Sequence, residues 1–192
     1  MDYLHQFLFG IYPYIAAAVF LLGSLARFER DQYTWRSESS QMLRTGALRL
    51  GSNLFHIGII GLFFGHMVGL LTPVAVWDAL GVPHGAKQLF AMTAGGIMGS
   101  MCLIGLLILI HRRLSEERIA AQTRFGDKLV LVWLLVTVSL GLATIPVSAG
   151  HMDGHMMVLL MSWAQHIVTF CGDAAEFIAA ASPVFKFHLF MG

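Results

Sequence analysis

The sequence has 192 residues, of which 57% are hydrophobic and only 12% are charged, and its mean hydropathy is +0.72. This composition is typical of an all-α membrane protein built as a transmembrane helix bundle, and it excludes a soluble domain. The formal net charge is +1 and no basic run is present, so nothing points to a nucleic-acid partner.

Four stretches of low charge predict complete transmembrane helices within a single membrane domain, 1–192. We place them at residues 3–26, 50–72, 89–110 and 129–147. Stretches of this length can cross a hydrocarbon core of roughly 30 Å at about 1.5 Å per residue. Pro13 is expected to kink the first span, and Pro73 to end the second.

Two shorter helices are predicted after the fourth span. Residues 155–170 place polar side chains on one face, which favours a helix lying in the membrane interface. Ser182 followed by Pro183 is typical of a helix start, so residues 183–192 form the beginning of a fifth span. Ten residues cover about half of a bilayer core.

The basic residues predict the orientation. Of the twelve Lys and Arg residues, five lie in the connector after the first span and five in the connector after the third. The positive-inside rule makes both connectors cytoplasmic. The N-terminus, residues 73–88 and residues 148–182 are therefore expected on the outer side of the membrane. Lys87 is the single lysine or arginine of the 73–88 loop.

The second span carries two histidines in a run without Asp, Glu, Lys or Arg. His56 and His66 are ten positions apart, or about 15 Å along a helix. Imidazoles inside a membrane helix are costly unless they are used. They could hydrogen-bond to neighbouring helices, relay protons as in a channel or transporter, or bind haem iron as axial ligands.

Glycines line the same helix at three- and four-residue spacing: Gly58, Gly61, Gly65 and Gly69. Such a stripe favours close contact with another helix, or leaves room for the edge of a porphyrin. The helix alone does not distinguish these interpretations. Similar glycines in the third span predict close packing there as well.

The expected depth of each histidine in the membrane indicates which two could bind the same ion. His66 is near the outer end of its helix, and His188 enters from the outer side, so the two are expected at matching depth. His56 has no depth-matched partner. We expect the polypeptide to continue past Gly192 and to supply one, because a helix ending there would also leave its last carbonyls unsatisfied in hydrocarbon.

Other candidate ligands are weaker. His151, Asp153 and His155 could bind a metal ion, although they lie in a glycine-containing loop. Cys102 and Cys171 stand alone, without the motif for covalent haem attachment or the cysteines for an iron–sulfur cluster.

Several strings carry a family resemblance that runs nearly from end to end. They are IYPYIAAAVFLLGS, QYTWRSESSQML, SNLFHIGIIGLFFGHMVGLLTP, AMTAGG, CLIG and GLATIPVSAGHMDG. With them, the chain resembles the gamma subunit of respiratory nitrate reductase, a dihaem cytochrome b that oxidises quinol.

The resemblance implies particular roles for five residues. His66 and His188 would bind the iron of an outer haem b, and His56 that of an inner haem b whose second ligand is not in these 192 residues. Gly65, His66 and Lys87 would line the quinol pocket.

The resemblance also implies a location and partners. The protein would span a bacterial or archaeal cytoplasmic membrane several times, with its N-terminus outside. It would pass electrons to an iron–sulfur subunit and a molybdenum catalytic subunit at the cytoplasmic face, where nitrate is reduced. The alternatives are a cytochrome b of another quinone-linked reductase and a histidine-relay proton channel or transporter.

Overall fold

The structure, a computed structural model, describes residues 2–30, 33 and 45–192. Within that part every regular element is a helix, so the prediction of an all-α membrane protein is confirmed. The elements are α1 (Tyr3–Gln6), the π-helix η1 (Phe7–Ile11), α2 (Tyr12–Arg30), α3 (Thr45–Leu71), α4 (Val74–Ala79), α5 (His84–Ser115), α6 (Glu117–Gln122), α7 (Phe125–Ala149), α8 (His155–Val168), α9 (Ala174–Phe177) and α10 (Pro183–Met191). Arg36, Arg44 and most of the YTWR string lie outside the described residues.

Four helical segments of the described chain are long and apolar enough to cross a membrane. They are Tyr3–Arg30, which joins α1, η1 and α2, then Gly46–Leu71 in α3, His84–Ser115 in α5 and Phe125–Ala149 in α7. The third extends beyond the predicted span 89–110 at both ends. As a result Lys87, which the sequence analysis assigns to a loop, lies in the first turn of a helix.

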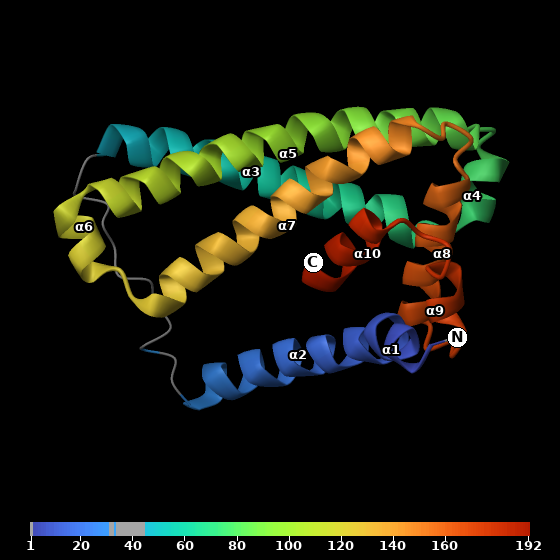
Figure 1. Cartoon of the computed structure of the whole chain (residues 1–192), viewed down its shortest axis with the longest axis horizontal. Coiled ribbons are helices and arrows are strands. Elements are labelled where there is room, and N and C mark those ends of the chain that lie inside the picture. Colours follow the sequence, from blue (N-terminus) through green and yellow to red (C-terminus); the bar gives the residue numbers. More distant parts are fainter. Residues whose placement is uncertain (1, 31–32, 34–44) are drawn as a thin grey trace.

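The long helices form a three-helix group with α2 apart from it (Figure 1). Helices α3 and α5 lie side by side, and α7 packs against α5. Helix α10 packs against α7 and occupies the space between α7 and α2 (Figure 1). Large apolar side chains of α2 are exposed, as a lipid-facing helix requires.

Close approach of α3 and α5 depends on glycine. A Cβ atom on Gly58 would lie 2.5 Å from the backbone nitrogen of Cys102 and 2.6 Å from the carbonyl oxygen of Met98. On the other side of the contact, a Cβ atom on Gly105 would meet the backbone nitrogen of Phe55. Small residues on both helices therefore bring the two backbones together, as expected for membrane helices.

Pro13 has a specific effect on the first span. Proline has no N–H, so the carbonyl of Phe9, four residues earlier, loses its α-helical donor. The structure has the π-helical turn η1 just before Pro13, and the Phe9 carbonyl accepts a hydrogen bond of 2.9 Å from Nε1 of Trp163 in α8. A side chain of α8 thus replaces the helical donor that the proline removes, and this hydrogen bond connects the first span to α8.

A small core closes one end of the molecule. Its buried members come from η1, from α9 and the turn after it, and from α10: Phe9, Ala175, Ile178, Ala181 and Phe185. This core sets the position at which α10 enters the bundle.

Side chains from other helices satisfy exposed helix ends. Gln165 of α8 donates to the carbonyls of Leu70 and Thr72 at the end of α3. Trp133 of α7 donates to the carbonyl of Met191 at 3.0 Å. This last contact corrects the expectation that all the final carbonyls of the 183–192 helix lack partners, because a neighbouring helix supplies a donor.

Candidate functional site

The two histidines of α3 are held in the same way. The Nδ1–H of His56 donates to the carbonyl of Ser52 at 2.7 Å, and that of His66 donates to the carbonyl of Leu62 at 2.7 Å. Both bonds reach back one turn along the helix. A histidine whose Nδ1 is engaged in this way keeps Nε2 free as a metal ligand.

His188 lies in α10, which packs against α7. Its ring lies against α7, where a Cβ atom on Gly141 would be 3.0 Å from its Cε1 atom. Its Nδ1 atom is buried and has no hydrogen-bond partner. A buried nitrogen without a partner is costly, so the ring is suited to a ligand that would use it.

The structure brings His66 and His188 together. Their ring centroids are 6.2 Å apart and their planes are inclined by 56°. A bond from imidazole nitrogen to a transition metal is about 2 Å long, so two imidazoles on opposite sides of one ion have centroids roughly 6.3 Å apart. The planes can take any mutual angle because each ring rotates about its metal–nitrogen bond. The separation of the two rings therefore matches that of two histidines bound to one metal ion.

Lys87 of α5 is buried where this helix meets the end of α3, with 6% of its surface exposed. Its ammonium donates to the carbonyl of Gly69 at 3.3 Å and to the sulfur of Met161 at 2.7 Å. It also lies 4.4 Å from the ring centroid of Trp77, a cation–π contact. The lysine therefore points into the protein, toward the backbone one turn beyond Gly65, and does not extend to the membrane surface.

Comparison with known proteins gives the family. The family model for the nitrate reductase gamma subunit matches residues 5–192. The respiratory nitrate reductase 1 gamma chain of Escherichia coli is 50% identical over all 192 residues, which cover 85% of that protein. The nitrate reductase gamma chain of Bacillus subtilis is 34% identical over 188 residues, 97% of this chain and 83% of that one. The chain belongs to the nitrate reductase gamma subunit family. Membership identifies it as one subunit of a multi-subunit oxidoreductase, and the resemblance stated from the sequence is confirmed.

In this gamma-subunit family member the glycine stripe of α3 divides into two parts. Gly58 and Gly61 face α5, where Cβ atoms would meet the backbone at Cys102 and the side chain of Met98. Cβ atoms on Gly65 and Gly69 would have no atom within 4 Å. The stripe is therefore not one continuous helix contact, and its second part, beside His66, is open.

His56 is exposed on the first half of α3. Its ring contacts that of Phe55 at a centroid distance of 5.3 Å. Among the described residues, no second imidazole contacts it. The structure thus brings together two of the three predicted haem ligands and leaves the third by itself.

Sequence reasoning missed Gln88. This buried side chain donates from Nε2 to the carbonyls of Ser148 and His151, each at 2.9 Å, and its Oε1 accepts from the backbone N–H of Gly154 at 2.8 Å. It therefore fixes the loop between α7 and α8 against the start of α5. A buried amide with three partners has no sequence pattern of its own, because its partners are backbone groups far along the chain.

The HMDG string has a structural reason as well. Gly154 has φ of 76°, and a Cβ atom there would lie 2.5 Å from Cβ of His84. Only glycine fits this turn without strain. Asp153 accepts from the backbone N–H of His155 at 3.0 Å. Within the described residues, the three candidate ligands of this loop do not form a metal-binding group.

Proposed function

We propose that this chain is the quinol-oxidising, haem-binding subunit of a respiratory nitrate reductase. The observation that supports this most directly is the approach of His66 and His188, from two helices far apart in the sequence, to the separation of two ligands on one ion. Family membership adds that the relatives are nitrate reductase gamma chains.

His66 and His188 would hold an outer haem b, and His56 an inner one. The bonds of His56 and His66 to the carbonyls one turn earlier fix the ring orientation and leave Nε2 for iron. The open space at Gly65 and Gly69 would admit the porphyrin edge or a quinol ring. When bound, haem supplies one-electron redox chemistry.

Quinol would bind beside the outer pair. An ammonium has three N–H donors, and the ammonium of Lys87 makes two hydrogen bonds, to Gly69 and Met161. One donor remains for a quinol oxygen. The indole Nε1 of Trp77 is buried beside it without a partner and offers a second donor. Both groups would orient the quinol head group against Gly65 and His66.

The direction of electron flow follows from the topology. The basic ends of α2 and α5 lie at one end of the molecule, and α4, α8 and α9 lie at the other (Figure 1). With the basic end in the cytoplasm, oxidation of quinol near α4 and α8 releases protons outside. Electrons would leave toward an iron–sulfur subunit and a molybdenum catalytic subunit on the cytoplasmic side, where nitrate is reduced.

A reduced-minus-oxidised absorption spectrum with haem quantitation tests this proposal. We expect b-type haem in the purified protein, and we expect His66→Gln and His188→Gln each to remove the same haem. His111→Gln is the matched control, because His111 is exposed near the C-terminal end of α5 and its Nδ1 lies 3.2 Å from the hydroxyl of Ser115. A protein without haem, or variants that keep full haem content, would overturn the proposal.

A further inference from the structure

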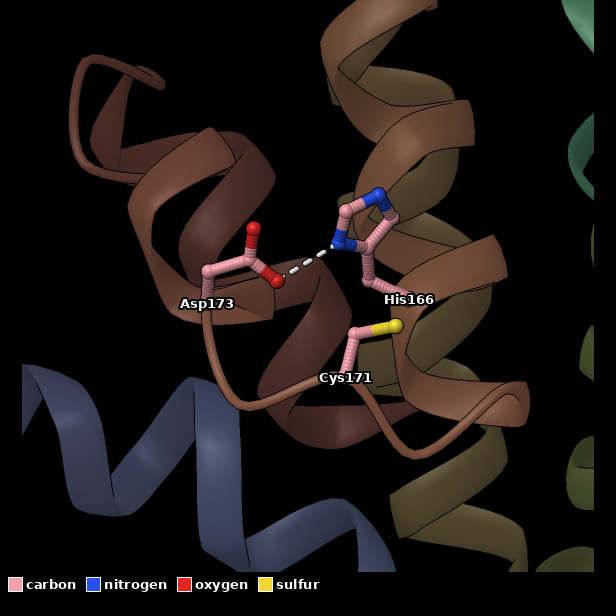
Figure 2. Close-up of side chains that lie close together, drawn as sticks. All are labelled: His166, Cys171 and Asp173. Carbon is pink, nitrogen blue, oxygen red and sulfur yellow. Dashed lines mark hydrogen bonds and ion pairs between the residues drawn. The ribbon is translucent and has the colours of Figure 1, made fainter.

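A second group of potential ligands lies outside the haem and quinol residues. His166 is in the last turn of α8, and Cys171 and Asp173 lie in the connection from α8 to α9 (Figure 2). One ligand atom from each lies within 4.8 Å of the others. The shortest of these contacts joins Nδ1 of His166 to Oδ1 of Asp173 at 2.7 Å. In the described part of the chain this is the single group of three such residues.

The turn that follows α8 places the thiol of Cys171 next to the last turn of that helix. The N–H of Cys171 donates to the carbonyl of His166 at 2.8 Å and closes the turn. The turn needs Phe170 at φ of 61°, a left-handed conformation uncommon for a residue with a side chain. The ring of Phe170 stacks on that of Tyr14 with centroids 5.5 Å apart, and the Tyr14 hydroxyl donates to the carbonyl of Ile167. Helix α2 thus supports the turn.

The other two ligands are supported from α9. Asp173 immediately precedes α9, whose first residues, Ala174 and Ala175, are fully packed in the protein. The ring of His166 meets that of Phe177 edge to face at 4.6 Å. The imidazole and the carboxylate are therefore placed by packed residues, whereas their ligand atoms stay accessible to an ion.

The donor set has a clear preference among metals. Imidazole nitrogen, thiolate sulfur and carboxylate oxygen are the three ligand types that zinc takes from proteins. Around a tetrahedral zinc ion, ligand atoms lie about 3.3 to 3.6 Å apart. The His166–Asp173 contact would open slightly and the sulfur would approach slightly to reach these distances. Three protein ligands would leave a fourth position for water.

The protonation of the group also suits a cation. An aspartate carboxylate is ionised at neutral pH, so Asp173 supplies a negatively charged oxygen. The hydroxyl of Thr169 donates its hydrogen to the carbonyl of Gln165 at 2.7 Å, so its oxygen, 3.4 Å from the sulfur of Cys171, can accept from the thiol, whose proton metal binding would release.

We propose that His166, Cys171 and Asp173 form a binding site for a zinc-type divalent ion at the junction of α8 and α9. The ion would tie the last turn of α8 to the start of α9, on the outer side of the membrane in the predicted topology. This site shares no residue with the haem and quinol groups, so its test does not depend on them.

Zinc binding to the purified full chain tests the proposal in three ways. After chelation and readdition of Zn²⁺, elemental analysis should give one zinc per chain, and zinc-edge X-ray absorption should show a sulfur ligand. Zn²⁺ should also slow the labelling of Cys171 by a maleimide, identified by mass spectrometry of the labelled peptide. Cys102 is buried and Cys171 is exposed, so the labelled thiol is unambiguous.

Variants then assign the ligands. Cys171→Ser, His166→Gln and Asp173→Asn should each weaken zinc binding by about tenfold or more. His155→Gln is the matched control, since His155 is an exposed histidine at the opposite end of α8. Far-UV circular dichroism and the thermal unfolding temperature check that each variant folds. Equal zinc affinity in Cys171→Ser and the parent, zinc without a sulfur ligand, or labelling that Zn²⁺ does not slow would each overturn the proposal. The labelling result needs no variant and so does not depend on folding.

Discussion

The ammonium of Lys87 lies 3.3 Å from the carbonyl oxygen of Gly69, one helical turn beyond Gly65. This contact joins the first turn of α5 to the last turns of α3 next to His66. A lysine that could have extended to the membrane surface is instead buried against the open part of the glycine stripe. The contact gives the predicted quinol pocket a charged donor inside the protein.

Replacing this donor should slow quinol oxidation and leave the haem in place. In Lys87→Met the apolar stem keeps its packing while the ammonium is lost. A hydrogen bond from a charged group contributes about 1.5 to 3 kcal/mol, so we expect kcat/KM for quinol to fall by about tenfold or more. Steady-state quinol oxidation and haem content are measured together. Lys87→Ala should act in the same direction.

Lys186→Met is the control for Lys87. Lys186 lies in the first turn of α10, at the start of the predicted fifth span, and its exposed ammonium donates to the carbonyl of Ala179. We expect a rate close to that of the parent. If the two variants lose activity equally, or if Lys87→Met loses haem, a direct role of Lys87 in quinol binding is wrong.

The divided glycine stripe predicts that two similar changes on α3 differ in their effect on stability. Gly58→Ala places a methyl group 2.5 Å from the backbone of Cys102, which cannot move without shifting α5. We expect a loss of about 1 to 3 kcal/mol of stability, seen as a lower unfolding temperature.

Gly65→Ala meets no atom within 4 Å and should not lower the stability of the protein without bound quinol. If quinol lies against Gly65, the same variant should raise KM for quinol. Equal unfolding temperatures for Gly58→Ala and the parent would contradict the close α3–α5 contact.

If His188 binds haem as proposed, a substitution at Gly141 should change the properties of that haem. A methyl group there would lie 3.0 Å from Cε1 of His188, so Gly141→Ala must displace the ring by a few tenths of an ångström. We expect haem to be retained with an altered midpoint potential or electron paramagnetic resonance spectrum. Gly95→Ala is the control, because its methyl group would meet nothing within 4 Å. Identical spectra for Gly141→Ala and the parent would show that His188 does not bind the iron.

The orientation of the chain can be read with fusion reporters. Ten of the twelve basic residues, five in each connector, follow the first and third spans, and both connectors are predicted to be cytoplasmic. Alkaline phosphatase fused after residue 30 or residue 116 should be inactive, and the same reporter fused after residue 80 should be active. Phosphatase activity of the fusion at residue 30 or 116 would show that the predicted topology, and with it the proposed direction of electron flow, is wrong.

The sequence alone was sufficient for the class of fold and for the pairing of His66 with His188. Long runs without charge must be helices in a bilayer, because the hydrocarbon offers no partners for an unpaired backbone. Once the helices and their directions are known, depth follows from counting residues, and His66 and His188 do lie side by side. The family strings added the nitrate reductase relationship, which the family model confirms.

Only the tertiary structure decided which way each side chain faces. Lipid and a neighbouring helix are both apolar, so an apolar sequence does not reveal how a helix is rotated about its axis. For this reason the separation of Gly58 from Gly65, and the inward direction of Lys87, could not be derived from the spacing of residues.

The contacts of Gln88 and the grouping of His166, Cys171 and Asp173 depend on loops. Each depends on one turn with a left-handed backbone conformation. The turn at Gly154 brings its N–H to Gln88, and the turn at Phe170 brings Cys171 to His166. A turn of this kind at Phe170 leaves no pattern in the sequence, since phenylalanine rarely adopts it and is held there by packing against Tyr14. The sequence therefore determined which segments form long apolar helices, and the packing between the helices determined which side chains meet.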